Sequence, residues 1–190
     1  CVVLRNMEER GVRVSTDVLK AIEKKYGEII EGLTKEIYSL AGETFNIASP
    51  KQLGDILFDK LGLPHGKKTK TGYSVSEDVL SNLAPKHPIV NAVLEYRHYT
   101  KLQSTYVMGL QPLVNRGRIH TEFNQCITQT GRLSSTNPNL QNIPARSDEA
   151  KDIKSAFIPG ENCVLVSADY SQIELRLLAH MSGDEQLIEA

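Results

Sequence analysis

The sequence lacks any long apolar segment and has few cysteines. No apolar run approaches the roughly twenty residues that a membrane-spanning helix needs, and the first residues show no signal-peptide pattern. The three cysteines, Cys1, Cys126 and Cys163, have no metal-ligand spacing. Cys126 and Cys163 lie in strand-like runs, so we expect buried, reduced thiols. These absences predict a soluble, cytoplasmic protein that is not exported and has no membrane partner.

Net positive charge is also absent. The formal net charge is −1 at pH 7, which does not by itself indicate a nucleic-acid-binding protein. A whole-chain sum can hide a local basic groove, however, because binding responds to clusters of charge. For each cluster the alternative is a solvated surface. The candidate clusters are Lys67, Lys68 and Lys70; Arg97, His98 and Lys101; Arg116 and Arg118; and Arg132 with Arg146.

The sequence contains two long stretches of helical periodicity. Ser15 or Thr16 can cap a helix that ends at Gly42, and a second helix runs from Pro88 to about Leu110. Because both are amphipathic, they can pack antiparallel within one chain. The alternative is a coiled-coil scaffold that self-associates through the first helix. The apolar positions of that helix are Leu19, Ile22, Tyr26, Ile29, Leu33, Ile37 and Leu40.

Shorter helices are expected around the long ones. One covers residues 1–10, and another begins where Ser49 is followed by proline. The unpaired amides of this second helix, with Ser49 and Lys51, form either a simple cap or a site for a DNA phosphate. After a basic loop at residues 66–72, a capping-box pattern at residues 74–77 predicts a third short helix.

The periodicity changes from helical to alternating beyond Pro112, which is the only shift in composition along the chain. We therefore expect an α+β fold, with long antiparallel helices in residues 1–112 and the start of an antiparallel sheet in residues 113–190. The expected elements of the second region are a strand at 118–124, a loop at 134–144, a short helix at 148–154, and a strand pair at 156–158 and 163–166.

Asp169 lies where the expected strand at 163–166 gives way to a helix that includes Ile173. A carboxylate at the carboxyl end of a strand is well placed to hold a divalent metal against a phosphate, because hard cations prefer oxygen ligands. The alternative is a structural junction, since Ser171 and Glu174 also fit a capping box.

Residues 169–176 (DYSQIELR), 130–135 (TGRLSS) and 138–144 (PNLQNIP) form long motifs in a characteristic order. The first resembles the first conserved polymerase motif of the DNA polymerase I family (family A), and the other two resemble that family's primer–template-binding segment. The likeness covers essentially the whole chain. It implies that residues 1–112 are the thumb with a flanking helix, and that residues 113–190 are the N-terminal part of the palm. The implied function is DNA-directed DNA polymerase in replication and repair.

The resemblance implies roles for individual residues of the 169–176 motif. Asp169 would bridge two Mg²⁺ ions, with the backbone carbonyl of Tyr170 as a further ligand, while a primer 3′-hydroxyl attacks a deoxynucleoside triphosphate. Glu174 would close off the sugar 2′ position, which disfavours an RNA polymerase. The remaining site residues are Tyr170, Ser171 and Gln172 at the nucleotide, and Arg176 in a supporting role.

The resemblance also implies a set of duplex-binding residues. Some are donors suited to minor-groove acceptors, which every correct base pair presents, and others contact the phosphate backbone. For the Asn-rich run, a hydrogen-bonded loop is the alternative. The chain departs from the family pattern at Gln103, Gln129 and Asn137, and the first departure would weaken a phosphate contact. The implied duplex-binding residues are Arg132, Asn139, Gln141, Asn142, Arg97 and Lys101, and the helix start with Ser49 and Lys51 is the further candidate from local sequence.

The family's fingers helix and second catalytic carboxylate would lie beyond Ala190. We therefore expect the chain alone to be inactive, and the complete polymerase to act as a monomer on primer–template DNA and deoxynucleoside triphosphates. The alternative function is a non-catalytic duplex-DNA-binding module derived from this fold, in which Asp169 is structural.

Overall fold

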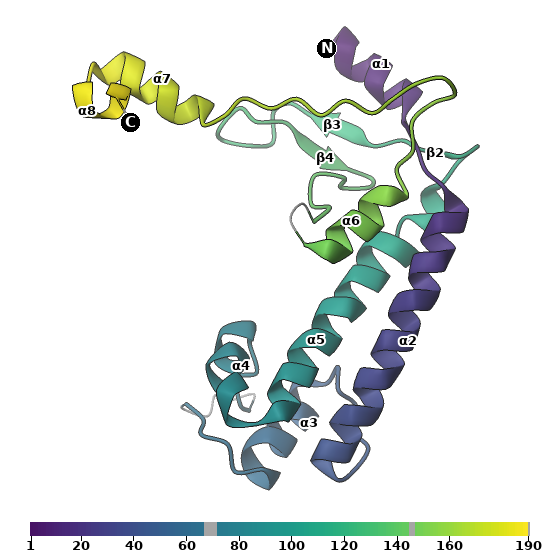
Figure 1. The fold of residues 1–190 in the computed structure, drawn as a ribbon, viewed down its shortest axis with the longest axis vertical. Coiled ribbons are helices and arrows are strands. Elements are labelled where there is room, and N and C mark those ends of the chain that lie inside the picture. Colours follow the sequence, from purple (N-terminus) through teal and green to yellow (C-terminus); the bar gives the residue numbers. More distant parts are fainter. Residues whose placement is uncertain (67–71, 145–146, 190) are drawn as a thin grey trace. The chain divides into compact units, whose positions relative to one another are not determined.

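The computed structural model describes residues 1–66, 72–144 and 147–189, which form two compact units, Cys1–Ile158 and Pro159–Ala190. The first unit contains both long helices and the short strands (Figure 1). The lysines of the basic loop and Arg146 lie outside the described residues. The expected α+β fold is confirmed, because helices predominate and the strands pair antiparallel.

Helices α2 (Thr16–Ala41) and α5 (Pro88–Leu102) form the long antiparallel pair of the first unit (Figure 1). Ser15 caps α2 by accepting a hydrogen bond from the amide of Val18 at 3.3 Å, and Gly42 ends it in the left-handed conformation. Helix α5 continues as the π-helical segment η3 (Gln103–Met108). The apolar stripe of α2 is therefore covered by a helix of the same chain, as predicted.

Two clusters of buried side chains lie along the helix pair. Ile29 and Tyr99 pack against both, so the clusters are continuous through the pair. Such burial stabilises a helix more than its intrinsic propensity does. The first core cluster includes Leu33, Ile37, Leu53, Leu57, Leu80, Val90 and Val93. The second core cluster includes Leu19, Tyr26, Leu102, Tyr106, Val107, Ile119 and Ile153.

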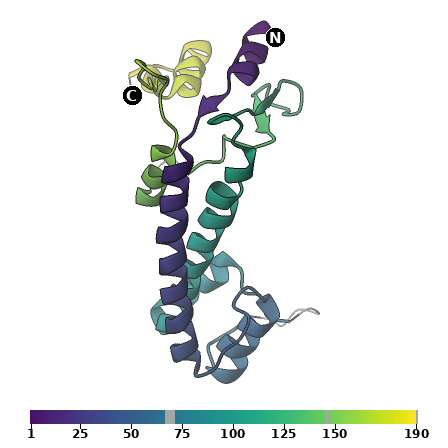
Figure 2. The same ribbon diagram turned by 90° about the vertical axis from the view of Figure 1, so that its right-hand side faces the viewer.

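Short helices complete the far end of the pair (Figure 2). Ser49 accepts a hydrogen bond from the amide of Gln52, so the predicted cap of α3 is present. Ser76 occupies the N-cap of α4 without a side-chain cap bond, so the predicted capping box at residues 74–77 is wrong. The bounds at this end are α3 (Pro50–Gly54) with η1 (Asp55–Lys60), α4 (Glu77–Leu83) and η2 (Ala84–Lys86). Helix α1 (Val2–Arg10) lies at the other end of the pair, near the strands (Figure 1).

The strands form two small antiparallel pairs. Strand β1 (Val12–Arg13) pairs with β2 (Arg118–Ile119), and β3 (Glu122–Asn124) pairs with β4 (Ser134–Thr136). The expected loop at 134–144 therefore begins as a strand, because β3 supplies it with a partner. The helical segment η4 (Gln111–Leu113) precedes β2.

The segment at 156–158 follows helix α6 (Asp148–Ser155), which confirms the expected helix at 148–154. The segment at 156–158 pairs with residues 13–15, at the end of β1. The amide of Ser15 donates to the carbonyl of Ala156 at 2.8 Å, and the amide of Ile158 donates to the carbonyl of Arg13 at 3.1 Å. The predicted pairing of 156–158 with 163–166 is therefore wrong.

The second unit contains helices α7 (Ile173–Ser182) and α8 (Glu185–Glu189) after a stretch without regular structure. The predicted buried strand at 163–166 is wrong: Val164 and Val166 are 80% and 83% exposed. A strand needs a hydrogen-bonded neighbour, and the described residues provide none for this segment.

The cysteines differ from expectation as well. All three are reduced as expected, but each is exposed, so the prediction of buried thiols is wrong. Cys163 ends a turn in which its amide donates to the carbonyl of Gly160 at 3.1 Å, and Cys126 lies in the connection between β3 and β4. None of the helices in the described part of the chain is both long and apolar enough to cross a membrane.

Candidate nucleic-acid interface

Two buried hydroxyls hold the loop that carries the Asn-rich run. Thr121 and Ser135 are 7% and 1% exposed, and their hydroxyl oxygens lie 2.6 Å apart. Each hydroxyl has one proton to donate. Thr121 Oγ1 lies 2.7 Å from the carbonyl oxygen of Pro138, and Ser135 Oγ accepts from the amide of Leu140 at 3.1 Å. One consistent arrangement has Ser135 donating to Thr121 and Thr121 donating to Pro138, which fixes the loop at residues 138–140.

Hydrogen bonds within the loop use parts of two predicted duplex-binding side chains. The Asn139 side-chain oxygen accepts from the amide of Gln141 at 3.0 Å, which is an Asx turn. The Gln141 side-chain amide donates to the carbonyl of Leu133 at 3.2 Å. These bonds support the hydrogen-bonded-loop interpretation, and they order the side chains without using the amide N–H donors of Asn139.

A cleft of about 490 Å³ separates this loop from helix α5 and η3. It brings together Lys101, Asn139 and Asn142, which come from two segments far apart in sequence and which the sequence predicts to contact DNA. Lys101 is exposed. The cleft is lined by Lys101, Thr105, Tyr106, Gly109, Leu110, Pro138, Asn139 and Asn142.

The other predicted duplex-binding residues lie outside this cleft. Arg97 is half-buried, and its Nη1 donates to the carbonyl of Val75 at 2.6 Å, so its guanidinium joins α5 to the segment before α4. Burial lowers the pKa of this guanidinium. Ser49 and Lys51 lie at the start of α3, and Lys51 is exposed. Arg132 is exposed and follows Gly131, which has a positive φ of 74°.

The predicted nucleotide-binding motif lies in the second unit and is exposed. Gln172 occupies the N-cap of α7 in the left-handed conformation, with φ 47°, and makes no side-chain cap bond. The alternative interpretation, in which Ser171 is the N-cap of a capping box, is not supported, because the N-cap is Gln172. Ser171 Oγ instead donates to Gln172 Oε1. Arg176 Nε donates to the carbonyl of Ser171 at 3.0 Å, so its supporting contact is to the backbone of the turn.

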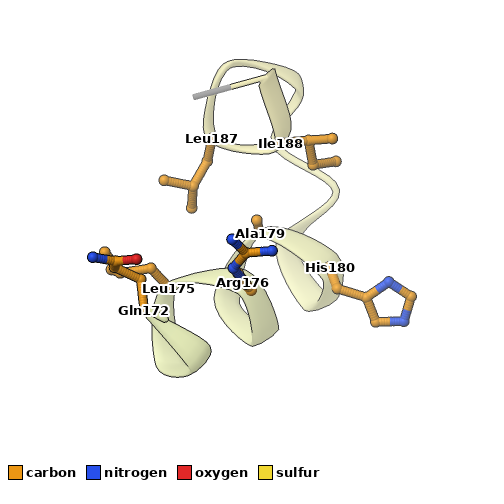
Figure 3. A pocket seen from close by; sticks show the side chains of 7 residues that line it. All are labelled: Gln172, Leu175, Arg176, Ala179, His180, Leu187 and Ile188. Atoms are coloured by element: carbon orange, nitrogen blue, oxygen red, sulfur yellow. The ribbon is translucent and has the colours of Figure 1, made fainter. Parts of the chain in front are cut away.

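A pocket of about 590 Å³ lies between α7 and α8. Gln172 and Arg176 line it together with apolar side chains, and Figure 3 shows Leu187 pointing from α8 toward α7. The polar ends of Gln172 and Arg176 are the groups that could contact a nucleotide there. The lining residues are Gln172, Leu175, Arg176, Ala179, His180, Leu187 and Ile188.

The ligands available at Asp169 are of the type that binds magnesium, but they are too few for a complete site. A carboxylate and a backbone carbonyl are hard oxygen ligands of the type that Mg²⁺ prefers. A two-ion site needs additional carboxylates, and the described residues contain no group of three acidic, histidine or cysteine side chains that could hold a metal. Asp169 and Tyr170 would therefore supply only part of such a site.

The sequence model described as "DNA polymerase family A" matches residues 16–190. The chain belongs to DNA polymerase family A. DNA polymerase I of Lactococcus lactis subsp. lactis (strain IL1403) is 58% identical over 189 residues, which are 99% of this chain and 22% of that protein. DNA polymerase I of Bacillus subtilis (strain 168) is 56% identical over 191 residues, again 99% of this chain and 22% of that protein.

A solved structure is similar over nearly the whole chain of this family A member. The POL domain of Pol1 from M. smegmatis, in complex with DNA primer-template and dNTP, has a TM-score of 0.86 and 45% sequence identity. The similarity covers 98% of this chain and 34% of that one. The chain thus spans about a fifth of the curated relatives and about a third of this structural neighbour.

Sequence reasoning about this family A chain missed three residues of the loop support. Tyr106 falls within the second predicted long helix, and its sequence context does not indicate that its hydroxyl donates to the carbonyl of Asn142. Thr121 and Ser135 were assigned to a strand and a loop. The one available signal was Thr121, a polar residue between apolar Ile119 and Phe123 on the same strand face.

Proposed function

We propose that the chain is the part of a DNA-directed DNA polymerase that binds primer–template duplex and supplies one catalytic carboxylate. Residues 1–112 would form the thumb, and residues 113–190 the start of the palm. The cleft that joins Lys101, Asn139 and Asn142 carries this proposal. The family relationship and the DNA and dNTP in the similar Pol1 structure support it.

The proposed duplex contacts follow from the chemistry of the cleft. Lys101 would neutralise a backbone phosphate, and its contribution would weaken with salt. The amide donors of Asn139 and Asn142 would contact purine N3 and pyrimidine O2, the minor-groove acceptors that all correct pairs share. Such contacts bind a correctly paired duplex without preference for its sequence. Arg97, Arg132, Gln141, Ser49 and Lys51 would extend the duplex contact.

The proposed catalytic contribution of this chain lies in residues 169–176. Asp169 and the Tyr170 carbonyl would hold magnesium together with carboxylates from outside the described residues. Bound magnesium would lower the charge cost of phosphoryl transfer. Glu174 would select deoxyribose by excluding a 2′-hydroxyl, and Ser171, Gln172 and Arg176 would orient the nucleotide. Because its donor set is incomplete, the chain alone would not extend a primer.

A non-catalytic duplex-binding module is the second candidate. The lone, exposed Asp169 and the lack of a metal-binding group among the described residues favour it. Both functions predict duplex binding, and only the first requires the carboxylate of Asp169.

The test is a chimera in which this chain replaces the matching segment of the L. lactis polymerase. We expect the chimera to extend a primer with Mg²⁺, and Asp169→Asn to lower turnover by on the order of a thousandfold or more while leaving duplex affinity unchanged. The matched control is Asp184→Asn, because Asp184 caps α8 by accepting from the amide of Leu187 and asparagine keeps that oxygen. Full activity of the Asp169→Asn chimera would favour the non-catalytic module, and primer extension by the chain alone would contradict the expected inactivity.

A further inference from the structure

Tyr106 connects the second core cluster to the loop of the proposed interface. It lies on η3 and is 9% exposed, with its ring packed in the second core cluster. Its hydroxyl donates to the backbone carbonyl of Asn142, 36 residues further along the chain. A buried hydroxyl that keeps a partner avoids a desolvation cost, so the bond favours loop positions in which the Asn142 carbonyl lies against the Tyr106 hydroxyl.

The loop is thereby held at both ends. Thr121 and Ser135 fix Pro138 and Leu140 from the strand side, and Tyr106 fixes Asn142 from the helix side. The side chains of Asn139 and Gln141 lie between these attachment points. Loss of the Tyr106 bond would leave the attachment through Thr121 and Ser135 intact and would release the loop at Asn142.

The same helix carries the cationic side of the cleft. Lys101 precedes Tyr106 by five residues, and both line the cleft with Asn139 and Asn142. A hydrogen bond from Tyr106 therefore constrains the separation between the helical segment that carries Lys101 and the loop that carries the amide donors. A duplex has a fixed spacing between phosphate and minor-groove acceptors, so this distance affects binding.

We propose that Tyr106 is a positioning residue for duplex binding, which couples the loop at residues 138–142 to the helix that carries Lys101. This inference rests on the proposed function, because it assigns the cleft to primer–template DNA. Tyr106 acts through the backbone of Asn142 and not by contact with the bases. Its hydroxyl raises the fraction of molecules whose loop is competent to bind, and apparent affinity scales with that fraction.

The test compares two tyrosine-to-phenylalanine variants of the chain, each measured for binding to a primer–template duplex by fluorescence anisotropy at several salt concentrations. Tyr106→Phe keeps the buried ring and removes the hydroxyl. Tyr38→Phe is the matched control, since the Tyr38 hydroxyl also donates to a backbone carbonyl, that of Phe45 at 2.9 Å. We expect Tyr106→Phe to weaken binding roughly three- to tenfold, and Tyr38→Phe to change it less than about twofold.

Salt dependence separates positioning from charge loss. Tyr106→Phe should leave the slope of log affinity against log salt unchanged, whereas Lys101→Ala should reduce it by about one. Amide hydrogen exchange in residues 138–142 should also accelerate in Tyr106→Phe and not in Tyr38→Phe. Unchanged affinity and exchange in Tyr106→Phe would overturn this inference alone. Absence of salt-dependent duplex affinity in the unsubstituted chain would overturn the proposed function, and this inference with it.

Discussion

At the residue scale, Glu149 ties helix α6 to the two long helices. The Tyr26 hydroxyl donates to the Glu149 carbonyl at 3.2 Å, and the Tyr99 hydroxyl donates to its carboxylate at 3.3 Å. Beside them, Lys25 and Asp152 form an ion pair at 2.6 Å. Burial raises the pKa of Tyr26 still further above neutrality, and the protonated hydroxyl is the form that donates this bond. These contacts anchor the chain directly after the loop of the proposed interface.

The carboxylate of Glu149 gives this anchor a pH dependence. Hydrogen bonds, the largest from the Ser147 side chain, lower the pKa of Glu149 from its ordinary value of 4.5. A lowered folded-state pKa contributes stability that is present above the unfolded value and lost as the pH falls through the folded value. We expect the free energy of unfolding of the unsubstituted chain to exceed that of the Glu149→Gln variant at pH 7. The difference between the two should shrink below about pH 4.5. Urea denaturation at a series of pH values measures it.

Glu31→Gln is the matched control for Glu149. Its hydrogen bond with Lys35 also lowers the pKa of Glu31, but both side chains are exposed. Its effect should disappear in about 1 M NaCl, where the Debye length is about 3 Å, whereas the effect of Glu149→Gln should largely persist. A difference between the chain and Glu149→Gln that stays constant from pH 7 to pH 3 would contradict this assignment.

At the element scale, Gly11 allows α1 to end against strand β2. It has φ 61°, and a Cβ atom there would lie 2.6 Å from the carbonyl oxygen of Ile119. Both the conformation and the close approach require glycine. We expect Gly11→Ala to lower the free energy of unfolding by about 2 kcal/mol or more. Gly32→Ala, at a helical position with nothing nearby, should instead raise it by roughly 0.5–1 kcal/mol. Urea denaturation of both variants measures these changes in the free energy of unfolding. Equal changes in the two variants would refute the steric argument.

The helices and the strands differ in how well local sequence predicts them. Helix α2 was predicted with its ends because Ser15, Gly42 and the apolar spacing act within a few residues of one another. Strand β4 and the segment at 163–166 were mispredicted, since a strand depends on a partner that local sequence does not identify. The candidate residues Lys101 and Asn139 were named from the family resemblance. The hydroxyls that position the loop could not be named in this way, because their partners lie far away in the sequence and become neighbours only in the folded chain.

At the scale of the whole molecule, the two units bury their apolar residues to different degrees. Both core clusters lie in the first unit, whereas Ala179 is the one buried residue among those described in the second. Exposed apolar groups of this density mark surfaces that bind other protein segments. The chain spans 34% of the similar Pol1 chain, so we expect these groups to be covered in a polymerase of the relatives' length. They are Val164, Leu165, Val166, Tyr170, Leu175, Leu177, Leu178 and Met181.

Limited proteolysis of the chain tests this difference between the units. Proteases cleave exposed, irregular segments first, and residues 161–171 are exposed and without helix or strand. We expect chymotrypsin to cut first at Leu165 and Tyr170, and to leave a resistant fragment that contains the first unit. Tyr26 and Tyr106 serve as internal controls, because both are buried and should be cut only after unfolding. Mass spectrometry of the early products identifies the sites, and initial cleavage within the long helices would show that the first unit does not form a stable core.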